Sequence, residues 1–293
     1  EVIFTSGATE AAAVLSRVPE GRDILVDPTA HDCLWTHSRR GGRAPEGHVL
    51  AWGYANNETG IITDPPEPID GKRLFDGAWA DLLMLDIVQA VGKLPFSFAW
   101  SGADMAILSA HKFGGPKGVG ALILRDGVEI GPFLSGGGQE MGRRAGTENL
   151  IGIAGMGAAA TAAARDLADG VWDRVAQVRN ILEQALSGRE NETISVGNGL
   201  ARLPNTLCLI APGWKGETQV MAMDLAGFAV SAGSACSSGK VRSSRVLAAM
   251  GYDARLSGQA IRLSIGPDAT EDDVLRFADV WTAAYAKARS RAA

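Results

Sequence analysis

Residues 105–120 read MAILSAHKFGGPKGVG, an apolar run that ends in Ser109, His111 and Lys112 before a glycine-rich turn. Short continuous apolar runs are typical of strands buried in a parallel sheet. Because ligands of open α/β sheets bind just beyond the carboxyl ends of such strands, we expect Lys112 to lie at a ligand site. A partly desolvated lysine can form a Schiff base with a carbonyl. The alternative is a solvated lysine at the end of a strand.

A second apolar run, residues 82–85, ends in Asp86, and Gln89 follows three residues later. Pyridoxal phosphate requires a carboxylate that keeps its pyridine nitrogen protonated, beside the lysine that binds it. If a helix begins at Asp86, Gln89 lies about one turn further on and could donate to the phenolic oxygen of the ring. Asp86 could also be a helix N-cap, and the two roles can coexist.

The chain opens with a sequence that favours anion binding. Residues 2–11 read VIFTSGATEA, which predicts a strand, a glycine turn and the start of a helix. Backbone N–H groups near Ala8 and Thr9 would then face an anion at the positive end of the helix. A hydroxyl that only caps the helix is the alternative. Ser109 and His111 would add two polar groups to this cradle.

In this order, the blocks resemble those of cysteine desulfurases, which are pyridoxal-phosphate enzymes of the fold-type I aminotransferase superfamily, in the class V group. The resemblance covers nearly the whole chain. The matching blocks are TSGATE (5–10), His31, ANNE (55–58), DIVQ (86–89), SAHK (109–112) with GGPKGVG (114–120), GGGQE (136–140) with GTEN (146–149), SAC (234–236), and Ile261 with Arg262.

The resemblance implies the cofactor contacts. Lys112 would form the Schiff base with pyridoxal phosphate, Asp86 would pair with the pyridine nitrogen, and Gln89 would contact the phenolic oxygen. His31 would stack on the ring and help to move protons, which suits an imidazole with a pKa near 6.5. A histidine satisfied within its own loop is the alternative for His31.

It also implies a homodimer. Thr9, Ser109 and His111 would hold the phosphate group, joined by Thr147 from a second subunit. Arg262, which we expect at a strand end, resembles the arginine that binds the substrate carboxylate with its bidentate fork, assisted by Asn57. Without the resemblance, a surface ion pair would be the expected role of this arginine.

Cys236 lies in a run of small and polar residues, 231–239, that is typical of a loop. A thiol with a reference pKa of about 8.5 is partly thiolate at neutral pH. It could attack the sulfur of cofactor-bound cysteine to give alanine and a persulfide on Cys236.

Cys33 and Cys208 have structural explanations, and Cys208 fits a buried strand. Three cysteines without paired spacing argue against a metal site or a disulfide framework.

The composition excludes other classes. With 293 residues and 46% hydrophobic content, the chain can bury one large core or two modest ones. A net charge of -5 gives no electrostatic footprint for DNA or RNA. Without a signal peptide or an apolar run of membrane-spanning length, we expect a cytoplasmic protein that does not bind membranes.

Short apolar runs that alternate with helix-compatible segments predict an α/β fold, a mainly parallel doubly wound sheet with a second, smaller α+β domain. We expect a large pyridoxal-phosphate-binding domain over residues 1–150. Residues 151–293 would form a linking helix and the small domain that carries the cysteine loop. The strand-like runs are 24–26, 49–52, 82–85, 106–108, 119–124, 205–211, near 230, and 261–265, and the helical segments are 150–186, with a break near 169–170, and from about 271.

Two features depart from the family pattern. The chain begins inside a predicted strand, without the amino-terminal segment that in relatives completes the small domain and reaches the active site, so we interpret it as a fragment. Ile87 and Val88 replace a small and a hydroxyl-bearing residue between Asp86 and Gln89. Because the spacing is kept, we expect only the shape of the pocket to change.

Other readings fit part of the sequence. A cysteine hydrolase could use Cys236, His111 and Asp86, but Lys112 would then have no role. A selenocysteine lyase, or a class V aminotransferase or epimerase of the same fold, is the alternative within the cofactor class. We favour a homodimeric L-cysteine desulfurase that passes persulfide sulfur to an acceptor protein, such as an iron–sulfur scaffold. The sequence does not identify that acceptor.

Overall fold

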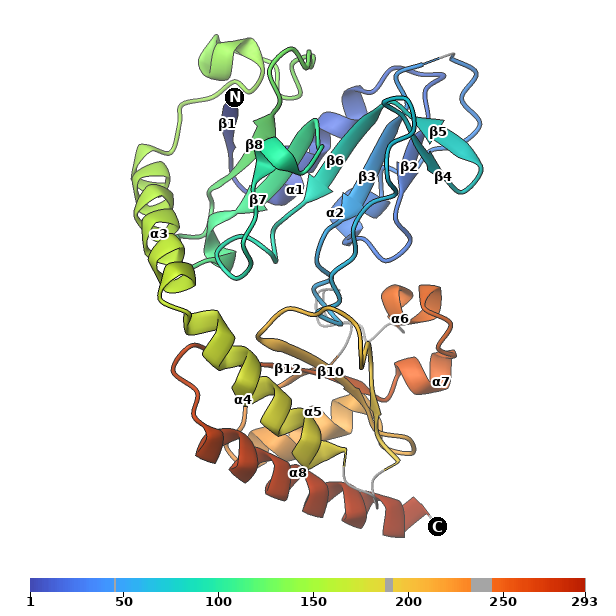
Figure 1. Cartoon of the computed structure of the whole chain (residues 1–293), viewed down its shortest axis with the longest axis vertical. Coiled ribbons are helices and arrows are strands. Elements are labelled where there is room, and N and C mark those ends of the chain that lie inside the picture. Colours follow the sequence, from blue (N-terminus) through green and yellow to red (C-terminus); the bar gives the residue numbers. More distant parts are fainter. Residues whose placement is uncertain (45, 188–191, 233–243, 293) are drawn as a thin grey trace. The chain divides into compact units, whose positions relative to one another are not determined.

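The computed structural model describes residues 1–44, 46–187, 192–232 and 244–292. The chain forms two compact units, which are described separately (Figure 1). The first comprises residues 1–55 and 63–169, and the second comprises residues 56–62 and 170–293. The division into domains 1–150 and 151–293 stays a prediction.

In its described residues, the first unit contains a six-stranded sheet with the order β1-β8-β7-β6-β3-β2. The neighbours from β2 to β7 run parallel, and β8 is antiparallel to both β7 and β1. The predicted mainly parallel α/β sheet is therefore confirmed. The elements of this unit are β1 (Val2–Thr5), α1 (Ala8–Ala12), β2 (Ile24–Val26), α2 (Asp32–Trp35), β3 (Val49–Gly53), β4 (Arg73–Phe75), β5 (Ala78–Ala80), β6 (Leu82–Asp86), β7 (Met105–Ser109), β8 (Gly120–Leu124) and α3 (Leu150–Ala168).

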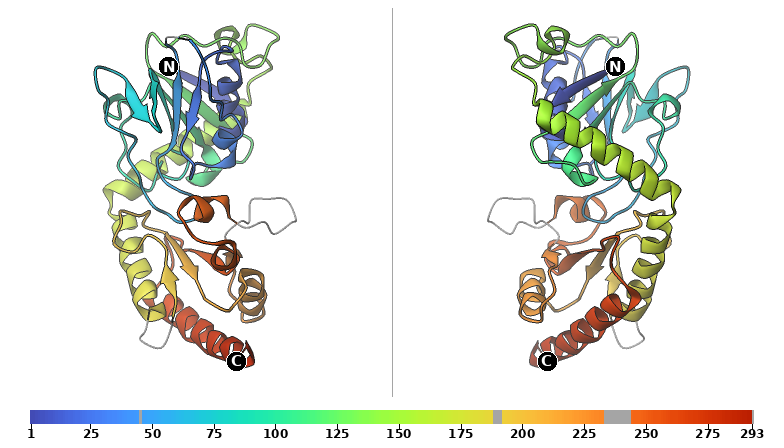
Figure 2. Two further views of the ribbon diagram at one scale, coloured as in Figure 1. Left: turned by 90° about the vertical axis from the view of Figure 1, so that its right-hand side faces the viewer. Right: turned by 90° about the vertical axis from the view of Figure 1, so that its left-hand side faces the viewer.

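Both faces of this sheet are apolar, which explains why its strands appear as continuous hydrophobic runs. Successive side chains of a strand point to opposite faces. Along β6, Met84 joins a core cluster with α1 and α2, whereas Leu83 and Leu85 join a second cluster that includes Met156 of α3. Figure 2 shows α3 on the opposite side of the sheet from α1.

Gly120 lies where β1 and β7 both end. In the strand register it faces Thr5 on one side and Ser109 on the other. A Cβ atom at this position would lie 2.5 Å from the carbonyl oxygen of Leu108 and 2.7 Å from the Cα of Gly7. Only glycine therefore allows the turn that begins α1 to approach the end of β7 so closely.

The described part of the second unit contains an antiparallel sheet with the order β11-β12-β10-β9. Helices α4 and α8 pack on one of its faces, and α6 and α7 belong to the cluster on the other. The predicted strands, the final helix and the break at Gly170 are confirmed. The elements are α4 (Val171–Leu186), β9 (Ile194–Ser195), β10 (Thr206–Ile210), α5 (Gly216–Leu225), β11 (Ser231–Ala232), α6 (Arg245–Ala249), α7 (Ala254–Ser257), β12 (Ala260–Ser264) and α8 (Glu271–Ala292).

We predict that Gly120→Ala destabilises the protein by roughly 1–3 kcal/mol, because the added methyl group collides with backbone atoms that cannot easily shift. Urea denaturation would measure the change. The matched control is Gly131→Ala, since a Cβ at Gly131 meets no atom within 4 Å. Equal stability of the two variants would contradict the predicted role of the close approach.

Candidate active site

Lys112 is the third residue after the end of β7. Residues Ala110–Lys112 form a single turn of 3-10 helix, with Ala110 buried and Lys112 exposed. The carbonyl oxygen of Ala110 accepts hydrogen bonds from the N–H groups of Phe113 and Gly115. This turn ends the strand and presents the lysine at the carboxyl edge of the sheet, as the sequence predicts.

Asp86 is the last residue of β6, the parallel neighbour of β7. Its carboxylate is buried and accepts a hydrogen bond from the N–H of Val88 at 3.0 Å. Burial raises the pKa of Asp86, whereas the Val88 hydrogen bond and the nearby His31 and Lys112 act in the opposite direction. Asp86, His31 and Lys112 therefore lie close enough to influence one another electrostatically.

No α-helix begins directly after Asp86 within the described residues, so the helix considered from the sequence is wrong. Residues 87–94 instead form successive turns, in which the carbonyl oxygens of Ile87 and Ala90 each accept two backbone hydrogen bonds. The Asp86 side chain closes a local turn through Val88 rather than capping a helix. The contact of Gln89 with a phenolic oxygen stays a prediction.

His31 is the N-cap residue of α2. Its Nδ1 accepts a hydrogen bond from the backbone N–H of Cys33 at 3.1 Å. In the neutral ring, this bond places the proton on Nε2. The local cap satisfies one nitrogen, as expected of a loop histidine, and the other keeps a donor that can serve a ligand.

Two residues of the predicted phosphate cradle contact each other. The backbone N–H of Ala8 donates to Ser109 Oγ at 2.8 Å, which links the start of α1 to the end of β7. Thr9 and His111 are exposed near these two positions in the chain. Burial and the positive charges of Lys112 and Lys117 lower the pKa of His111, so its ring is neutral at neutral pH and can donate one hydrogen bond.

Glu10 also orders this region, although its role was not predicted. Its carboxylate accepts a hydrogen bond from the N–H of Ser6 at 2.6 Å and forms an ion pair with Arg144 at 2.6 Å. Burial opposes ionisation, but the bonds from Arg144 and Ser6 hold the pKa of Glu10 below its usual value. The carboxylate thus joins the glycine turn to the segment that carries Thr147. Glu10 is the third residue of α1 after the N-cap Gly7, the position of the glutamate in a capping box, and this is the signal that could have revealed it.

Thr147 lines a small cavity of about 60 Å³ together with Thr5, Ser6 and Arg144. All of these residues belong to the first compact unit. The predicted role of Thr147 in the phosphate site of a second subunit stays a prediction.

The predicted substrate residues lie in the second compact unit. Arg262 Nη1 donates to the backbone oxygen of Asn57 at 2.9 Å. The Nε of Arg262 is buried and has no hydrogen-bond partner among the described residues. The sequence placed Arg262 at a strand end, which is wrong: it lies in the middle of β12, between Cys208 of β10 and Ser231 of β11.

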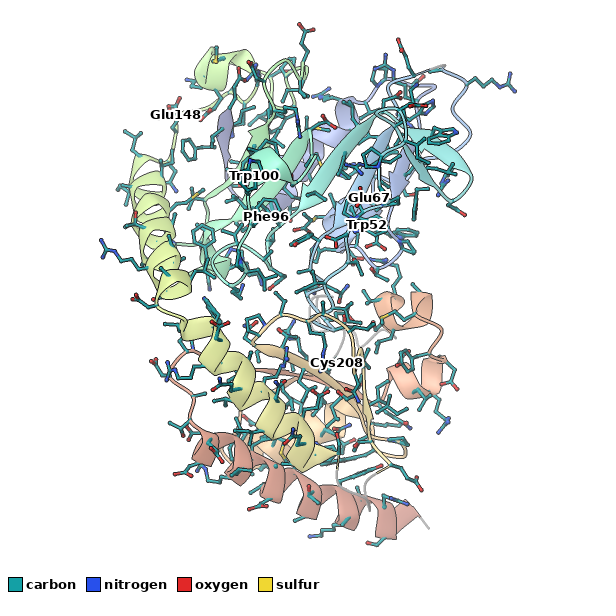
Figure 3. All side chains as sticks on the ribbon, in the orientation of Figure 1. Trp52, Glu67, Phe96, Trp100, Glu148 and Cys208 are labelled. Carbon is teal, nitrogen blue, oxygen red and sulfur yellow. The ribbon has the colours of Figure 1, made fainter. Side chains whose placement is uncertain are left out.

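Cys236 lies outside the described residues. The other two cysteines are buried free thiols, and Figure 3 shows Cys208 among the strands of the second unit. Burial raises the pKa of both Cys33 and Cys208 to about 12. Both are therefore protonated at neutral pH and are poor nucleophiles.

Within the described ranges, no group of three or more His, Cys, Asp or Glu residues could hold a metal ion. The helices in the same ranges also lack the length and apolar character needed to cross a membrane.

Residues 38–277 match the family model described as Aminotransferase class-V. The chain belongs to this family. It is 38% identical to a cysteine desulfurase of Gluconacetobacter diazotrophicus, over 99% of the chain and 79% of the relative. It is 41% identical to cysteine desulfurase 2 of Trichormus variabilis, over 94% and 75% of the two proteins. These relatives place the chain among the cysteine desulfurases, as the sequence predicts.

Solved structures confirm the fold. A NifS-like protein from Rickettsia africae superposes with a TM-score of 0.83 at 24% identity, covering 98% of this chain and 82% of that one. Another NifS-like protein gives a TM-score of 0.80 at 28% identity, with coverage of 97% and 82%. The family uses pyridoxal phosphate, and the chain is accordingly a pyridoxal-phosphate-dependent enzyme.

The residues present fit this cofactor. Among the described residues, the Asp86 carboxylate has a backbone hydrogen bond but no ion pair within 4 Å, although it is buried. A buried carboxylate is stable when a cation compensates it, and a protonated pyridine nitrogen would do so. Lys112 supplies an amine near the neighbouring strand end, and Ser109, whose Oγ accepts from the Ala8 N–H, supplies a hydroxyl that can donate to a phosphate.

We predict that Asp86→Asn raises the melting temperature of the cofactor-free protein at neutral pH. The folded-state pKa of Asp86 lies above the unfolded value, so its stabilising contribution is complete at low pH and is lost as the pH rises through the raised pKa. Asparagine carries no charge and avoids that loss. The melting temperature should rise by about 2–4 °C for each kcal/mol gained in the free energy of unfolding.

Calorimetry of both proteins measures this difference. The control is Asp104→Asn, since Asp104 accepts a hydrogen bond from Leu83 and pairs with Arg125 at 3.6 Å. That variant should not gain stability. A lower melting temperature for Asp86→Asn than for the wild type would show that the ionised carboxylate stabilises the empty site.

Proposed function

We propose that this protein is an L-cysteine desulfurase, which converts L-cysteine to L-alanine and leaves the sulfur as a persulfide on Cys236. The observation that carries the proposal is the buried carboxylate of Asp86, which has no ion pair among the described residues and lies within electrostatic reach of Lys112 near the neighbouring parallel strand end. This pair of groups meets the requirements of pyridoxal-phosphate chemistry.

The roles of the site residues follow from their chemistry. Bound pyridoxal phosphate supplies an electron sink for the substrate's Cα–H bond. Asp86 would hold the ring nitrogen protonated, and Lys112 would anchor the cofactor and move a proton at its Nζ. His31 would exchange a proton at Nε2, the nitrogen left available by its cap. Arg262, tied to Asn57, would bind the substrate carboxylate.

Cys236 would take up the sulfur. Its thiolate attacks the sulfur of the bound substrate, so that an S–S bond forms as the C–S bond breaks. The electron pair of the broken bond stays with carbon, which takes up a proton and becomes the methyl group of alanine. The burial of Cys33 and Cys208 supports this assignment, because both thiols are protonated at neutral pH.

We further propose that the enzyme acts as a homodimer, with Thr147 joining Thr9, Ser109 and His111 of the partner subunit around the phosphate. The persulfide sulfur would pass to an acceptor protein, for which an iron–sulfur scaffold is our candidate. The Ser109 hydroxyl supports the phosphate assignment, because the Ala8 N–H holds its oxygen and leaves its hydrogen to donate.

We predict that Lys112→Ala abolishes covalent attachment of the cofactor and turnover of cysteine, because no other amine follows β7 at this position. Borohydride reduction and mass spectrometry would locate the cofactor on the peptide that carries Lys112 in the wild type. The matched control is Lys215→Ala, which removes an exposed lysine of the second unit. Cysteine turnover by Lys112→Ala at the wild-type rate would rule out the assignment.

We predict that Cys236→Ala keeps cofactor binding but forms no persulfide. After incubation with cysteine, mass spectrometry should find one added sulfur on the wild-type peptide containing Cys236 and none on the variant. Cys33→Ala should retain the persulfide, because its thiol is buried. A persulfide on Cys33 or Cys208, with alanine still formed by Cys236→Ala, would show that another cysteine accepts the sulfur. Release of alanine from selenocysteine alone would instead indicate a selenocysteine lyase.

A further inference from the structure

Lys93 is a buried lysine close to the candidate site that the proposed chemistry does not use. The residue is 7% exposed. It belongs to the series of turns that follows β6 and carries Gln89. Lysine is seldom buried to this degree unless an anion or a set of hydrogen bonds compensates its charge.

The contacts of Lys93 compensate its charge only in part. Its Nζ donates to the backbone oxygen of Gln89 at 3.0 Å. Among the described residues, no carboxylate lies within ion-pair distance of this ammonium group. The charged group that influences it is Lys112, which has the same sign. The empty site therefore places two positive charges near each other, one of them buried.

The surroundings fix the position of this turn. A Cβ atom at Gly92 would lie 2.9 Å from the Cβ atoms of Phe113 and Ala163. The turn is thus pressed against the residue after Lys112 and against α3. Movement of Lys93 away from Lys112 would have to displace this packing.

Burial, and then the charge of Lys112, lowers the pKa of Lys93 to about 8, below its ordinary value of 10.5. At neutral pH the group is still mainly protonated. The buried charge therefore lowers the free energy of unfolding at neutral pH. This destabilisation decreases as the pH rises above about 8, because the folded protein then loses the proton. Groups with strongly shifted pKa values concentrate at functional sites, where function is often gained at the expense of protein stability.

We propose that Lys93 is a positioning residue of the cofactor site: its ammonium group fixes the turn that presents Gln89, and its positive charge favours an anionic ring oxygen bound beside Lys112. The inference rests on the proposed function, because it assumes that an anionic aldehyde cofactor binds at Lys112. Such a ligand would supply the negative charge that the described surroundings of Lys93 lack. Lys93 would act through Gln89 and the local charge rather than by contact with the substrate.

The test combines two measurements on Lys93→Met, which keeps the length of the side chain and removes its charge. The melting temperature of the cofactor-free variant at neutral pH should rise, because the buried charge is gone. Its dissociation constant for pyridoxal phosphate, followed by visible absorbance, should rise about tenfold or more, as expected for a lost hydrogen bond from a charged group. Lys287→Met, which removes an exposed lysine on α8, should change neither value.

A double-mutant cycle with Gln89→Ala tests whether the two residues act together. Because part of the effect of Lys93 runs through Gln89 and part through its charge, the double variant should bind the cofactor more weakly than either single variant, but by less than both losses multiplied. Independent losses would overturn the positioning role. A lower melting temperature, failure to fold, or an unchanged dissociation constant for Lys93→Met would also overturn it. If the wild type itself bound no cofactor, both the proposed function and this inference would fail.

Discussion

The parallel pairing of β6 with β7 is the constraint on which the candidate site depends. It brings the ends of two strands to the same edge of the sheet, where β6 ends in Asp86 and the residues after β7 include Lys112. Because β6 is covered on both faces, the Asp86 carboxylate is removed from water and its pKa is raised. The protonated ring nitrogen of the proposed cofactor would stabilise the buried carboxylate, and the nearby amine would bind its aldehyde group.

The second part of the site depends on close backbone packing rather than on charge. The strand β8 runs antiparallel between β1 and β7, so that Gly120 lies between Thr5 and Ser109. The absence of a side chain there lets the start of α1 reach the end of β7, where Ala8 binds Ser109. A single glycine on a third strand therefore allows Ala8 to hold the Ser109 hydroxyl in the predicted phosphate cradle.

Two charged groups of the empty site are buried without a partner of opposite charge among the described residues. Asp86 is buried without an ion pair among the described residues, and Lys93 is buried with a single carbonyl acceptor there. Each of these charges lowers the stability of the protein until a ligand of suitable charge binds. We interpret both buried charges as groups that reduce stability but favour cofactor binding. Replacing either one by a neutral side chain should therefore stabilise the empty protein and weaken cofactor binding.

The sequence alone indicated the strands of the six-stranded sheet, their buried character and the family, and it named candidate site residues whose roles stay predictions. This was possible because continuous apolar runs specify strands buried on both faces, and because residues at strand ends follow directly from those runs. It failed where the outcome depended on contacts between distant segments. Only the tertiary structure placed Arg262 in the middle of β12, replaced the expected helix after Asp86 with turns, and joined Glu10 to Arg144. It also buried Lys93 beside Lys112, because burial is decided by packing among elements far apart in the chain.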